Sequence, residues 1–322
     1  MKTNSDDQPD NSRSERSVDE TDLGIIEALH TNPRITNKAV AAKLRVSETT
    51  VAQRIRIMSD RGVMRVVAQR DVLIGGYTLM CLIDIDTIGD SSIIGNTIAK
   101  MDDVISVSRC LGESQLLVNV RARDRHHLDE LLADKIGRIG GIERIRSNIC
   151  LRIIKFESGY GDLSAQLPES AYPIGKSRSG RILRMLLDDG RISNREIARQ
   201  LDISEGSVRQ RLKKLYDENE IRLGVVCDPL KLNLAAIAIV RMATRPGQRA
   251  SIIAALAPNE RVAFVGTMAG QYDLWALIQM KDNLEIAQFC EQVVSGLAGV
   301  SRYNLSTLVS THMHRYDLVR IR

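Results

Sequence analysis

Apolar residues follow a helical spacing in the first part of the chain. They recur every three or four positions over residues 23–29, 39–44 and 51–58, which predicts three short amphipathic helices. Only a tight connection, Leu44 to Ser47, separates the second helix from the third. Such a short connection is typical of a helix-turn-helix.

The helical region is repeated later in the chain. Residues 34–67 realign with residues 191–224 without gaps, and 12 of the 34 aligned positions are identical, where roughly two would be expected by chance. A second match pairs LGESQLLVNV (111–120) with AGQYDLWALI (269–278), with one residue inserted between the two matches. Two unrelated amphipathic regions would not share so many identities. The chain is therefore interpreted as a tandem duplication of about 157 residues.

A different pattern follows the helical region in each copy, with segments in the order strand, helix, strand, strand, helix, strand. The segments are 72–86, 93–101, 104–110, 115–120, 126–139 and 142–156 in copy one, and 235–242, 250–256, 262–267, 274–280, 284–297 and 300–312 in copy two. This order predicts a ferredoxin-like βαββαβ domain, whose helices cover one face of a four-stranded antiparallel sheet. The other face needs a partner, either the sheet of the other copy or that of another chain.

The predicted fold class is α+β, with two winged or three-helix helix-turn-helix domains and two ferredoxin-like βαββαβ domains, produced by tandem duplication. A stretch rich in Gly, Ser and Pro between the copies predicts a linker. The expected divisions are a disordered tail at 1–17, helix-turn-helix domains at 18–68 and 175–226, a linker at 159–174, and ferredoxin-like effector or oligomerisation domains at 72–158 and 229–322.

Composition narrows the range of partners. The chain has 45 Lys and Arg against 40 Asp and Glu, a formal net charge of +5, which is compatible with an anionic partner. Aromatic residues make up 3% of the chain, too few for base-stacking platforms. No apolar run approaches the roughly 20 residues that span a bilayer, and residues 1–17 contain no apolar signal-peptide core. We therefore expect a cytoplasmic protein with no membrane partner.

Cysteine and histidine spacings do not indicate a metal site. The five cysteines are widely spaced and form no C-x-x-C pair, so they are expected to be buried small apolar residues. His312 and His314 would share one face of a strand, a spacing compatible with metal binding. No third ligand stands nearby in the sequence, and we predict no metal and no cofactor.

The third helix of each copy carries side chains suited to a DNA groove. Ser47 and Ser204 precede these helices, where a serine hydroxyl can accept an otherwise unpaired backbone N–H. The residues expected to contact DNA are Ser47, Thr49, Thr50, Gln53 and Arg54 in copy one, and Ser204, Ser207, Arg209, Gln210, Arg211 and Lys214 in copy two. Gln suits adenine, Arg suits guanine or phosphate, and a Thr methyl can meet thymine. An ordinary solvated helix is the alternative, but the duplicated Gln-Arg pair after a capped turn favours DNA.

The two copies are expected to read similar but non-identical half-sites. The Gln-Arg pair is shared, whereas Thr49-Thr50 of copy one is replaced by Gly206-Ser207 in copy two. Copy two has four basic residues on this helix and should bind phosphate more strongly. Half-sites one DNA turn apart, about 34 Å, or a multiple of it, are the geometric expectation.

The chain resembles the Lrp/AsnC family of transcription regulators. Residues 18–29 are similar to the opening helix of the family's DNA-binding part, and its later helices are matched by residues 34–36 and 44–47 with Val51, Arg54 and Ile55. Residues 227–229 look like the family's hinge, and residues 270–273 resemble its Gly-x-Tyr-Asp turn. Ordinary members carry one such unit per chain. Copy one also departs from the family's pattern, because residues 112–115 read Gly-Glu-Ser-Gln in place of that turn.

The resemblance implies a sequence-specific double-stranded DNA-binding regulator that forms homo-oligomers, dimers or larger, and binds a small amino-acid-like effector where two sheets meet. It implies that Gly270, Tyr272 and Asp273 lie at the effector site, with Asp273 accepting from an ammonium group. A purely structural turn is the alternative. If such an effector is bound, copy two should supply the turn that contacts it, and copy one should serve chiefly as a packing partner. Glu113 could substitute for the missing Asp, although a one-residue shift on a strand changes the face.

Two other classes of function stay open. Siroheme decarboxylases are similar to this family in fold and also occur as fused pairs, but they typically carry a His-Cys-Tyr-x-Arg motif that this sequence lacks. We therefore expect no enzyme activity and name no catalytic residues. A ligand-binding or scaffold module without DNA activity is the other alternative, and it predicts no salt-dependent retention on heparin.

Overall fold

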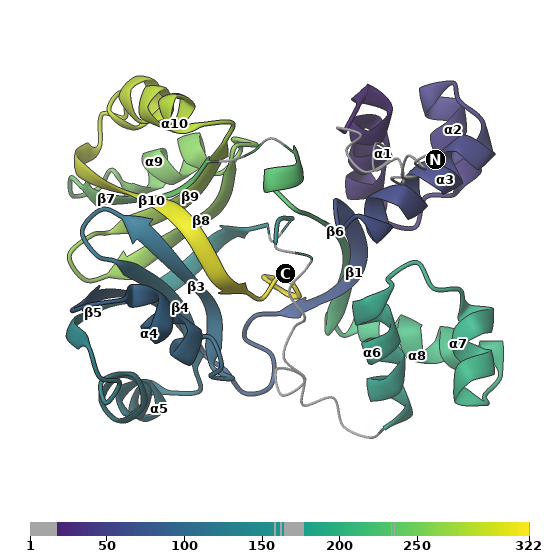
Figure 1. The fold of residues 1–322 in the computed structure, drawn as a ribbon, viewed down its shortest axis with the longest axis horizontal. Coiled ribbons are helices and arrows are strands. Elements are labelled where there is room, and N and C mark those ends of the chain that lie inside the picture. Colours follow the sequence, from purple (N-terminus) through teal and green to yellow (C-terminus); the bar gives the residue numbers. More distant parts are fainter. Residues whose placement is uncertain are drawn as a thin grey trace, which may run out of the picture.

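The computed structural model describes residues 18–157, 159–161, 163, 177–232, 234 and 236–321. The expected tail at 1–17 and most of the expected linker lie outside the described residues. Figure 1 shows a barrel with helices on its outside and, beyond a short ribbon of strands, two three-helix units. We call these units head one and head two, after the copy to which each belongs.

The heads are built alike. Their helices are α1 (Glu20–Thr31), α2 (Asn37–Leu44) and α3 (Glu48–Asp60) in head one, and α6 (Arg178–Asp188), α7 (Asn194–Leu201) and α8 (Glu205–Asp217) in head two. The Ser47 hydroxyl accepts the backbone N–H of Thr50 at 3.0 Å, and the Ser204 hydroxyl accepts that of Ser207 at 3.1 Å. These hydrogen bonds satisfy N–H groups that the first turn of a helix leaves unpaired. The predicted starts of both third helices are confirmed.

A ribbon of strands, which the sequence analysis missed, joins the heads to the barrel. Strand β1 (Met64–Asp71) pairs antiparallel with β6 (Ile221–Cys227), and β11 (Leu318–Val319) pairs parallel with the other edge of β1. Most of β1 is buried on both faces, so its residues lack the polar and apolar alternation of a half-buried strand. The two helix-turn-helix units share this ribbon.

The eight other strands close into a barrel. They are β2 (Leu79–Thr87), β3 (Val104–Leu111), β4 (Leu116–Ala122) and β5 (Ile142–Phe156) from copy one, and β7 (Ala236–Thr244), β8 (Val262–Ala269), β9 (Leu274–Met280) and β10 (Val300–His314) from copy two. Their order around the barrel is β10-β3-β4-β2-β5-β8-β9-β7. The long strands β5 and β10 each pair with their own sheet at one end and with the other copy's sheet at the other end. The partner of each sheet is therefore the other copy of the same chain.

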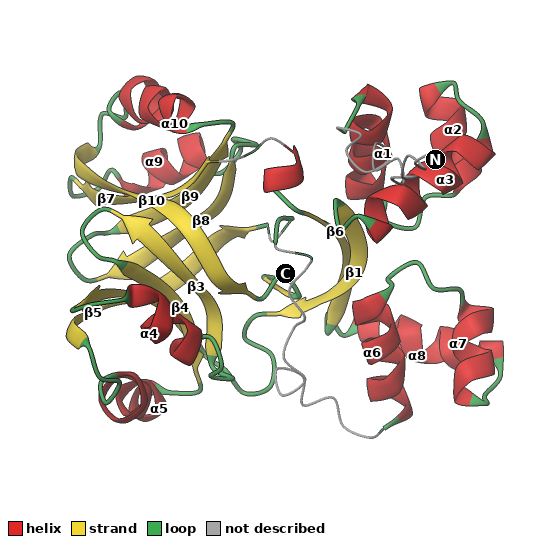
Figure 2. Ribbon diagram, viewed as in Figure 1, coloured by secondary structure: helices red, strands yellow, loops and turns green. Residues whose placement is uncertain are grey.

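Helices cover the outside of the barrel (Figure 2). They are α4 (Ser91–Ile98), α5 (Arg125–Glu130), α9 (Arg249–Leu256) and α10 (Asn283–Phe289). Helix α5 continues into a π-helical turn over Leu131–Ile136, and α10 does so over Cys290–Val294. The first predicted strand of copy one begins later than expected, because Gly75 and Gly76 adopt φ of 78° and 84° in the preceding loop.

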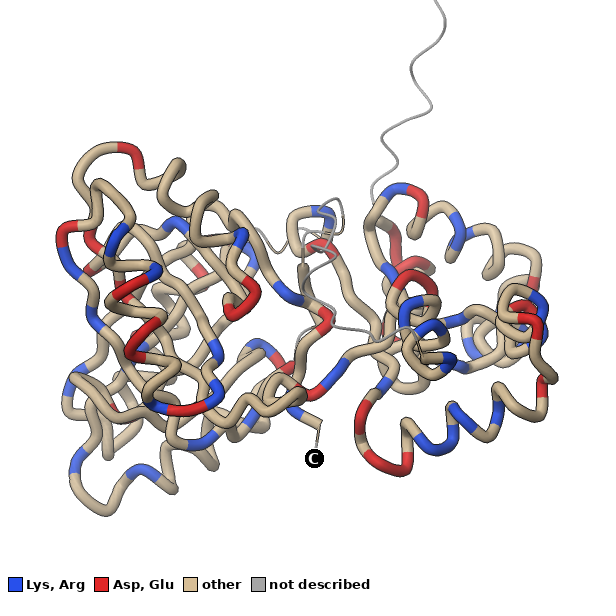
Figure 3. The backbone as a smooth tube through the Cα atoms, turned by 90° about the horizontal axis from the view of Figure 1, so that it is seen from below, with Lys and Arg blue, Asp and Glu red and all other residues tan. Residues whose placement is uncertain are grey.

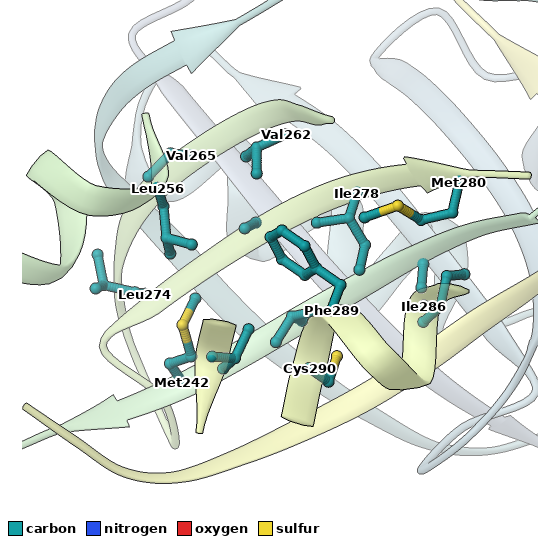
Figure 4. Packing of buried hydrophobic residues seen from close by; sticks show 14 of the residues in the cluster. Met242, Leu256, Val262, Val265, Leu274, Ile278, Met280, Ile286, Phe289 and Cys290 are labelled. Carbon is teal, nitrogen blue, oxygen red and sulfur yellow. The ribbon is translucent and has the colours of Figure 1, made fainter. Parts of the chain in front are cut away.

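Buried apolar residues form three layers in the barrel and its covering helices. In each copy, one layer lies between the sheet and its own helices. Figure 4 shows this layer in copy two, where Phe289 and Ile286 of α10 lie over the sheet. The third layer lies between the two sheets and includes Leu117, Phe264 and Trp275. Burial of this third layer holds the two copies together.

A buried ion pair crosses between the sheets. Arg241 Nη2 of β7 lies 2.9 Å from Asp84 Oδ1 of β2, and the two side chains are 1% and 3% exposed. Ser114 and Asn148 donate to Asp84, and Arg241 donates to Ser306. Asp84 and Arg241 occupy equivalent positions of the repeat. Two identical copies would place like charges here, so this divergence makes each copy the complement of the other.

Candidate nucleic-acid interface and effector site

Helices α3 and α8 present the predicted glutamine pair to solvent. Gln53 on α3 and Gln210 on α8 occupy equivalent positions and are both exposed. Thr49, Arg209 and Lys214 are exposed as well. Thr50 and Ser207 are half-buried, and their backbone N–H groups donate to the hydroxyls of the capping serines. Helix α8 therefore offers amide and basic groups to solvent, and α3 offers the amide of Gln53 and the hydroxyl of Thr49.

Arg54 does not face solvent as expected. Its Nη1 lies 2.7 Å from Asp19 Oδ2 and 3.0 Å from Asp22 Oδ1, and its side chain is 17% exposed. The hydrogen bond to Asp19 is the largest cause that raises the pKa of Arg54. The expected orientation of Arg54 is wrong, because helical spacing on α3 does not reveal that two carboxylates at the start of α1 lie opposite. Arg54 fastens α3 to α1.

Arg211, the equivalent residue of head two, lacks this pair of acids. Asp19 and Asp22 are replaced by Lys176 and Ser179 at the equivalent positions. Arg211 is half-buried, and its Nη1 lies 3.4 Å from Ser179 Oγ. DNA contact by Arg211 stays a prediction. The same residue type, arginine, therefore has different partners in the two heads.

Charges on the heads are mixed. Both Lys and Arg and Asp and Glu lie on the heads, as the right-hand half of Figure 3 shows. On α8, Lys213 pairs with Asp217 at 2.5 Å and Lys214 pairs with Glu218 at 3.7 Å. Exposed pairs of this kind contribute about 0.3–0.5 kcal/mol each. These lysines can therefore exchange a carboxylate for a phosphate at small cost.

The two heads are packed into one body. The core of head one includes Cys227 of β6, and the core of head two includes Ala68 of β1, so each head is completed by the strand of the other copy. Arg191 of head two also donates to the backbone carbonyls of Pro33 and Ile35 in head one, at 2.9 and 3.1 Å. The separation of α3 and α8 is therefore set within a single chain.

Asp273 is bound within the protein. Its Oδ2 accepts from the backbone N–H and the hydroxyl of Thr244, at 2.7 and 3.2 Å, and its Oδ1 pairs with Arg249 at 3.2 Å. Gln115 takes the same place in copy one, where its Oε1 accepts the backbone N–H of Thr87 at 3.1 Å. The contact that both copies keep is structural, because it fastens the turn to the end of a neighbouring strand. Contact between Asp273 and an effector stays a prediction.

Tyr272 reaches from copy two to copy one. Its side chain is buried, and its hydroxyl donates to Glu113 Oε1 at 3.0 Å. Burial, together with Glu113, raises the pKa of Tyr272. Gly270 precedes it with φ of 154°, and a Cβ there would come within 2.5 Å of Asn148 Oδ1. The turn therefore lies at the interface of the copies, and Glu113 binds Tyr272 there while Gln115 takes the place of Asp273.

A cavity of about 520 Å³ lies between the two sheets, beside the segments that lead to the ribbon. Leu230 and Val309 border it and are exposed, so the cavity reaches the surface. Its walls come from strands of both copies, and the turn with Gly270, Tyr272 and Asp273 does not line it. Sequence reasoning missed this site. Equivalent strand positions carry different types of residue in the two copies, and this difference is the signal in the sequence that could have indicated the site.

Family models match both parts of each copy. The Lrp/AsnC ligand binding domain matches residues 81–160 and 237–318, about half of the chain. The chain belongs to the Lrp/AsnC family. An AsnC-type helix-turn-helix domain matches residues 18–59, and a winged helix-turn-helix DNA-binding model matches residues 178–222.

Relatives in the Lrp/AsnC family correspond in length to about one copy. An uncharacterized HTH-type transcriptional regulator of Pyrococcus horikoshii is 28% identical over 139 residues, which cover 43% of this chain and 88% of the relative. The HTH-type transcriptional regulator LrpA of the same organism is 26% identical over 140 residues, 43% of this chain and 99% of LrpA. Among solved structures, the siroheme decarboxylase NirDL matches 92% of this chain and 93% of its own, with a TM-score of 0.61 and 15% identity. That likeness shows a shared fold.

The remaining sequence expectations concern membranes, thiols and metal. No helix in the described part of the chain is long and apolar enough to cross a membrane. All five cysteines are buried free thiols, as expected, and burial raises their pKa to about 11 or about 12. His312 Nδ1 lies 2.9 Å from Asn96 Oδ1. Over the described residues, no group of three or more His, Cys, Asp or Glu side chains could hold a metal ion.

The pH dependence of stability is expected to depend on His314, which lines the cavity. Burial lowers the pKa of His314 to about 4, whereas an unfolded histidine titrates near pH 6.5. Between those values only the unfolded chain binds the proton. The contribution of His314 to the free energy of unfolding should therefore fall by about 2–3 kcal/mol as the pH falls from about 6.5 to about 4, and should level off at lower pH.

Urea unfolding of His314→Phe, measured at pH 7 and pH 4.5, tests this dependence. Phe156 occupies the equivalent position of copy one, so the replacement suits this kind of site. The variant should lose less stability on acidification than the parent. His126→Phe, at a side chain that is 83% exposed, should behave as the parent. Equal pH dependence of all three proteins would contradict the prediction.

Proposed function

We propose that the chain binds double-stranded DNA sequence-specifically and regulates transcription. The observation that carries this proposal is the pair of capped recognition helices held at a set separation by one chain, with Gln53 and Gln210 exposed at equivalent positions. Helix-turn-helix dimers place two such helices in the major groove of two half-sites. One chain of this protein supplies both helices. We propose that it acts on DNA in the cytoplasm and that larger homo-oligomers form from such units.

We also propose that a small molecule controls DNA binding from the interface of the two ferredoxin-like domains. Asp273, the expected acceptor of an amino-acid ammonium group, already has three donors in the protein. The cavity between the sheets has free volume and borders the route to the ribbon. We therefore place the effector in the cavity in preference to the turn.

We further propose that the chain is not an enzyme. The second candidate is a siroheme decarboxylase, favoured by the shared fold with NirDL. A tetrapyrrole with several carboxylates would need several cationic partners in its pocket. Among the described residues that line the cavity, Lys231 is the single Lys or Arg. A change in the absorption spectrum of siroheme on mixing with the protein would favour the enzyme.

DNA binding is tested with a sequence selected in vitro and with random DNA of equal length. The selected sequence should bind more tightly, and the affinity should fall steeply between 50 and 200 mM salt because bound counterions are released. Gln53→Ala and Gln210→Ala should each cost about 1–3 kcal/mol and relax the preference for one base pair. Arg209→Ala should weaken binding to all sequences and reduce the salt slope by about 1.

Arg138→Ala is the matched control for Arg209→Ala. It removes the same charge from a side chain that is 76% exposed and lies after α5 on the outside of the barrel. It should leave DNA binding unchanged. Equal affinity for selected and random DNA at every salt concentration would refute sequence-specific binding.

A further inference from the structure

We infer that the cavity between the sheets binds an uncharged molecule with an aromatic body and one hydrogen-bonding end. This inference gives a chemical class to the effector of the proposed function, and it rests on that function only for its consequence in DNA binding. The cavity volume of about 520 Å³ lies within the roughly 300–1,000 Å³ of small-molecule sites. An eight-stranded barrel is also of the size that can enclose one small ligand.

One corner of the cavity is aromatic. Phe264 on β8 pairs in register with Leu277 on β9 and with Phe156 on β5. The rings of Phe264 and Phe156 lie edge to face with centroids 5.4 Å apart, and the Trp275 ring lies 4.0 Å from that of Phe264. All four side chains line the cavity. The three aromatic side chains offer flat surfaces against which an aromatic ring can pack, and Leu277 adds apolar surface beside them.

The equivalent corner in the other copy is polar. Ser106 on β3 pairs in register with Asn119 on β4 and with His314 on β10. These three residues repeat, pair for pair, the register positions of Phe264 and its two partners. Asn119 Nδ2 donates to Ser106 Oγ at 2.9 Å, and Asn119 Oδ1 is buried with no hydrogen-bond partner among the described residues. The copies have diverged into complementary apolar and hydrogen-bonding walls.

The charged side chains that line the cavity are already paired with each other or with neighbours. They are Glu157, Asp228 and Lys231. Lys231 Nζ lies 3.5 Å from Asp228 Oδ2, and Glu157 pairs with Lys155 at 3.4 Å. His314 is uncharged near neutral pH, because burial lowers its pKa to about 4. A buried ionised group without a partner costs several kcal/mol or more, so an uncharged ligand is favoured over an anion or a zwitterion.

The cavity is connected to the heads through two short segments. His314 is followed directly by the residues that lead into β11, and Arg70 of β1 donates from its backbone N–H to the Asp317 carbonyl at 2.7 Å. On the other side, the backbone N–H of Gly161, which lines the cavity, donates to the Cys227 carbonyl of β6 at 2.9 Å. A ligand would therefore contact segments that are hydrogen-bonded to β1 and to β6 of the ribbon.

Binding of 2-naphthol to the full chain without DNA tests the inference. This probe is aromatic, uncharged at pH 7 and carries one hydroxyl group. We expect a dissociation constant on the order of 0.1–1 mM, given its 11 non-hydrogen atoms and the usual free energy per ligand atom. Calorimetry measures the affinity, and quenching of Trp275, the only tryptophan, reports occupancy of the aromatic wall. The charged analogue 2-naphthoate and the zwitterion L-tryptophan should bind at least 10-fold more weakly.

Variants that copy residues from the other half of the repeat locate the site. Ser106→Phe introduces the side chain of Phe264, fills the cavity and should abolish binding. Asn119→Leu introduces the side chain of Leu277 and should weaken 2-naphthol about 5-fold or more by removing the hydrogen-bonding end. His126→Phe on the surface should leave binding unchanged.

No binding of 2-naphthol, tighter binding of 2-naphthoate or L-tryptophan, or full binding by both cavity variants would overturn the inference. If the chain binds 2-naphthol but does not bind DNA, the inference about the cavity is supported and only the proposed regulatory function is refuted.

Discussion

Replacement of Asp84 by Asn is expected to lower the free energy of unfolding by about 3–5 kcal/mol. The change leaves the Arg241 guanidinium, which is 1% exposed, without its main partner in the interface of the two copies. A guanidinium does not deprotonate in a protein, so it cannot escape burial by losing its charge. Glu113 at 3.3 Å can compensate only in part, since its side chain is one-third exposed. Urea unfolding at pH 7 gives the difference.

A double variant without either charge separates the effect of an unpaired buried charge from the general cost of substitution. Asp84→Leu with Arg241→Met removes both charges and should cost less than Asp84→Asn alone, because well-packed apolar residues often replace a buried pair without loss. Asp134→Asn breaks the exposed pair with Arg138 and should change stability by no more than about 0.5 kcal/mol. A cost below about 1 kcal/mol for Asp84→Asn would show that the pair does not hold the copies together.

Insertion of five base pairs between the two half-sites of a selected DNA sequence is expected to weaken binding by about 100-fold or more. Five base pairs turn the second half-site to the opposite face of the duplex. The heads cannot follow, because the core of each head includes a strand of the other copy and Arg191 binds across to Pro33 and Ile35. One head then loses its specific contacts. Fluorescence anisotropy with labelled duplexes measures the change.

A ten-base-pair insertion distinguishes fixed heads from tethered ones. It returns the half-site to the same face but moves it by about 34 Å, which heads with shared cores cannot span. Binding should therefore stay weak, whereas heads on flexible linkers would recover most of the affinity. The same insertions placed outside the half-sites should have no effect. Recovery with ten base pairs would show that the ribbon separates on DNA.

The sequence was sufficient to predict those parts of the fold that depend on residues close together in the chain. The helix starts at Ser47 and Ser204 could be predicted, because a serine before an amphipathic run offers its hydroxyl to the first turn. The duplication and the βαββαβ order could be read for a similar reason, since half-buried strands and helices carry their own periodicity. The ribbon could not, because β1 is buried on both faces and shows no alternation.

Side-chain partners from distant segments explain the errors at the candidate site. Arg54 and Arg211 occupy equivalent positions of the repeat and each follows a glutamine, but Asp19 and Asp22 bind the first, whereas the second contacts Ser179. Those acids lie more than 30 positions away on α1, where spacing on α3 carries no information about them. Likewise, the roles of Asp273 and Gln115 became clear only from the backbone N–H groups that they bind.

Local sequence patterns were enough to establish two copies of a helix-turn-helix joined to a ferredoxin-like unit, together with the exposed Gln53 and Gln210, because periodicity, caps and repeats are properties of short stretches of chain. The folded arrangement was needed to learn that the two copies close on each other into one barrel with a shared pair of heads. It was also needed to learn that Ser106 and Phe264 face one cavity from opposite corners. The reason is physical: which strand edge pairs with which, and which side chains share a cavity, depends on contacts between residues far apart in the chain.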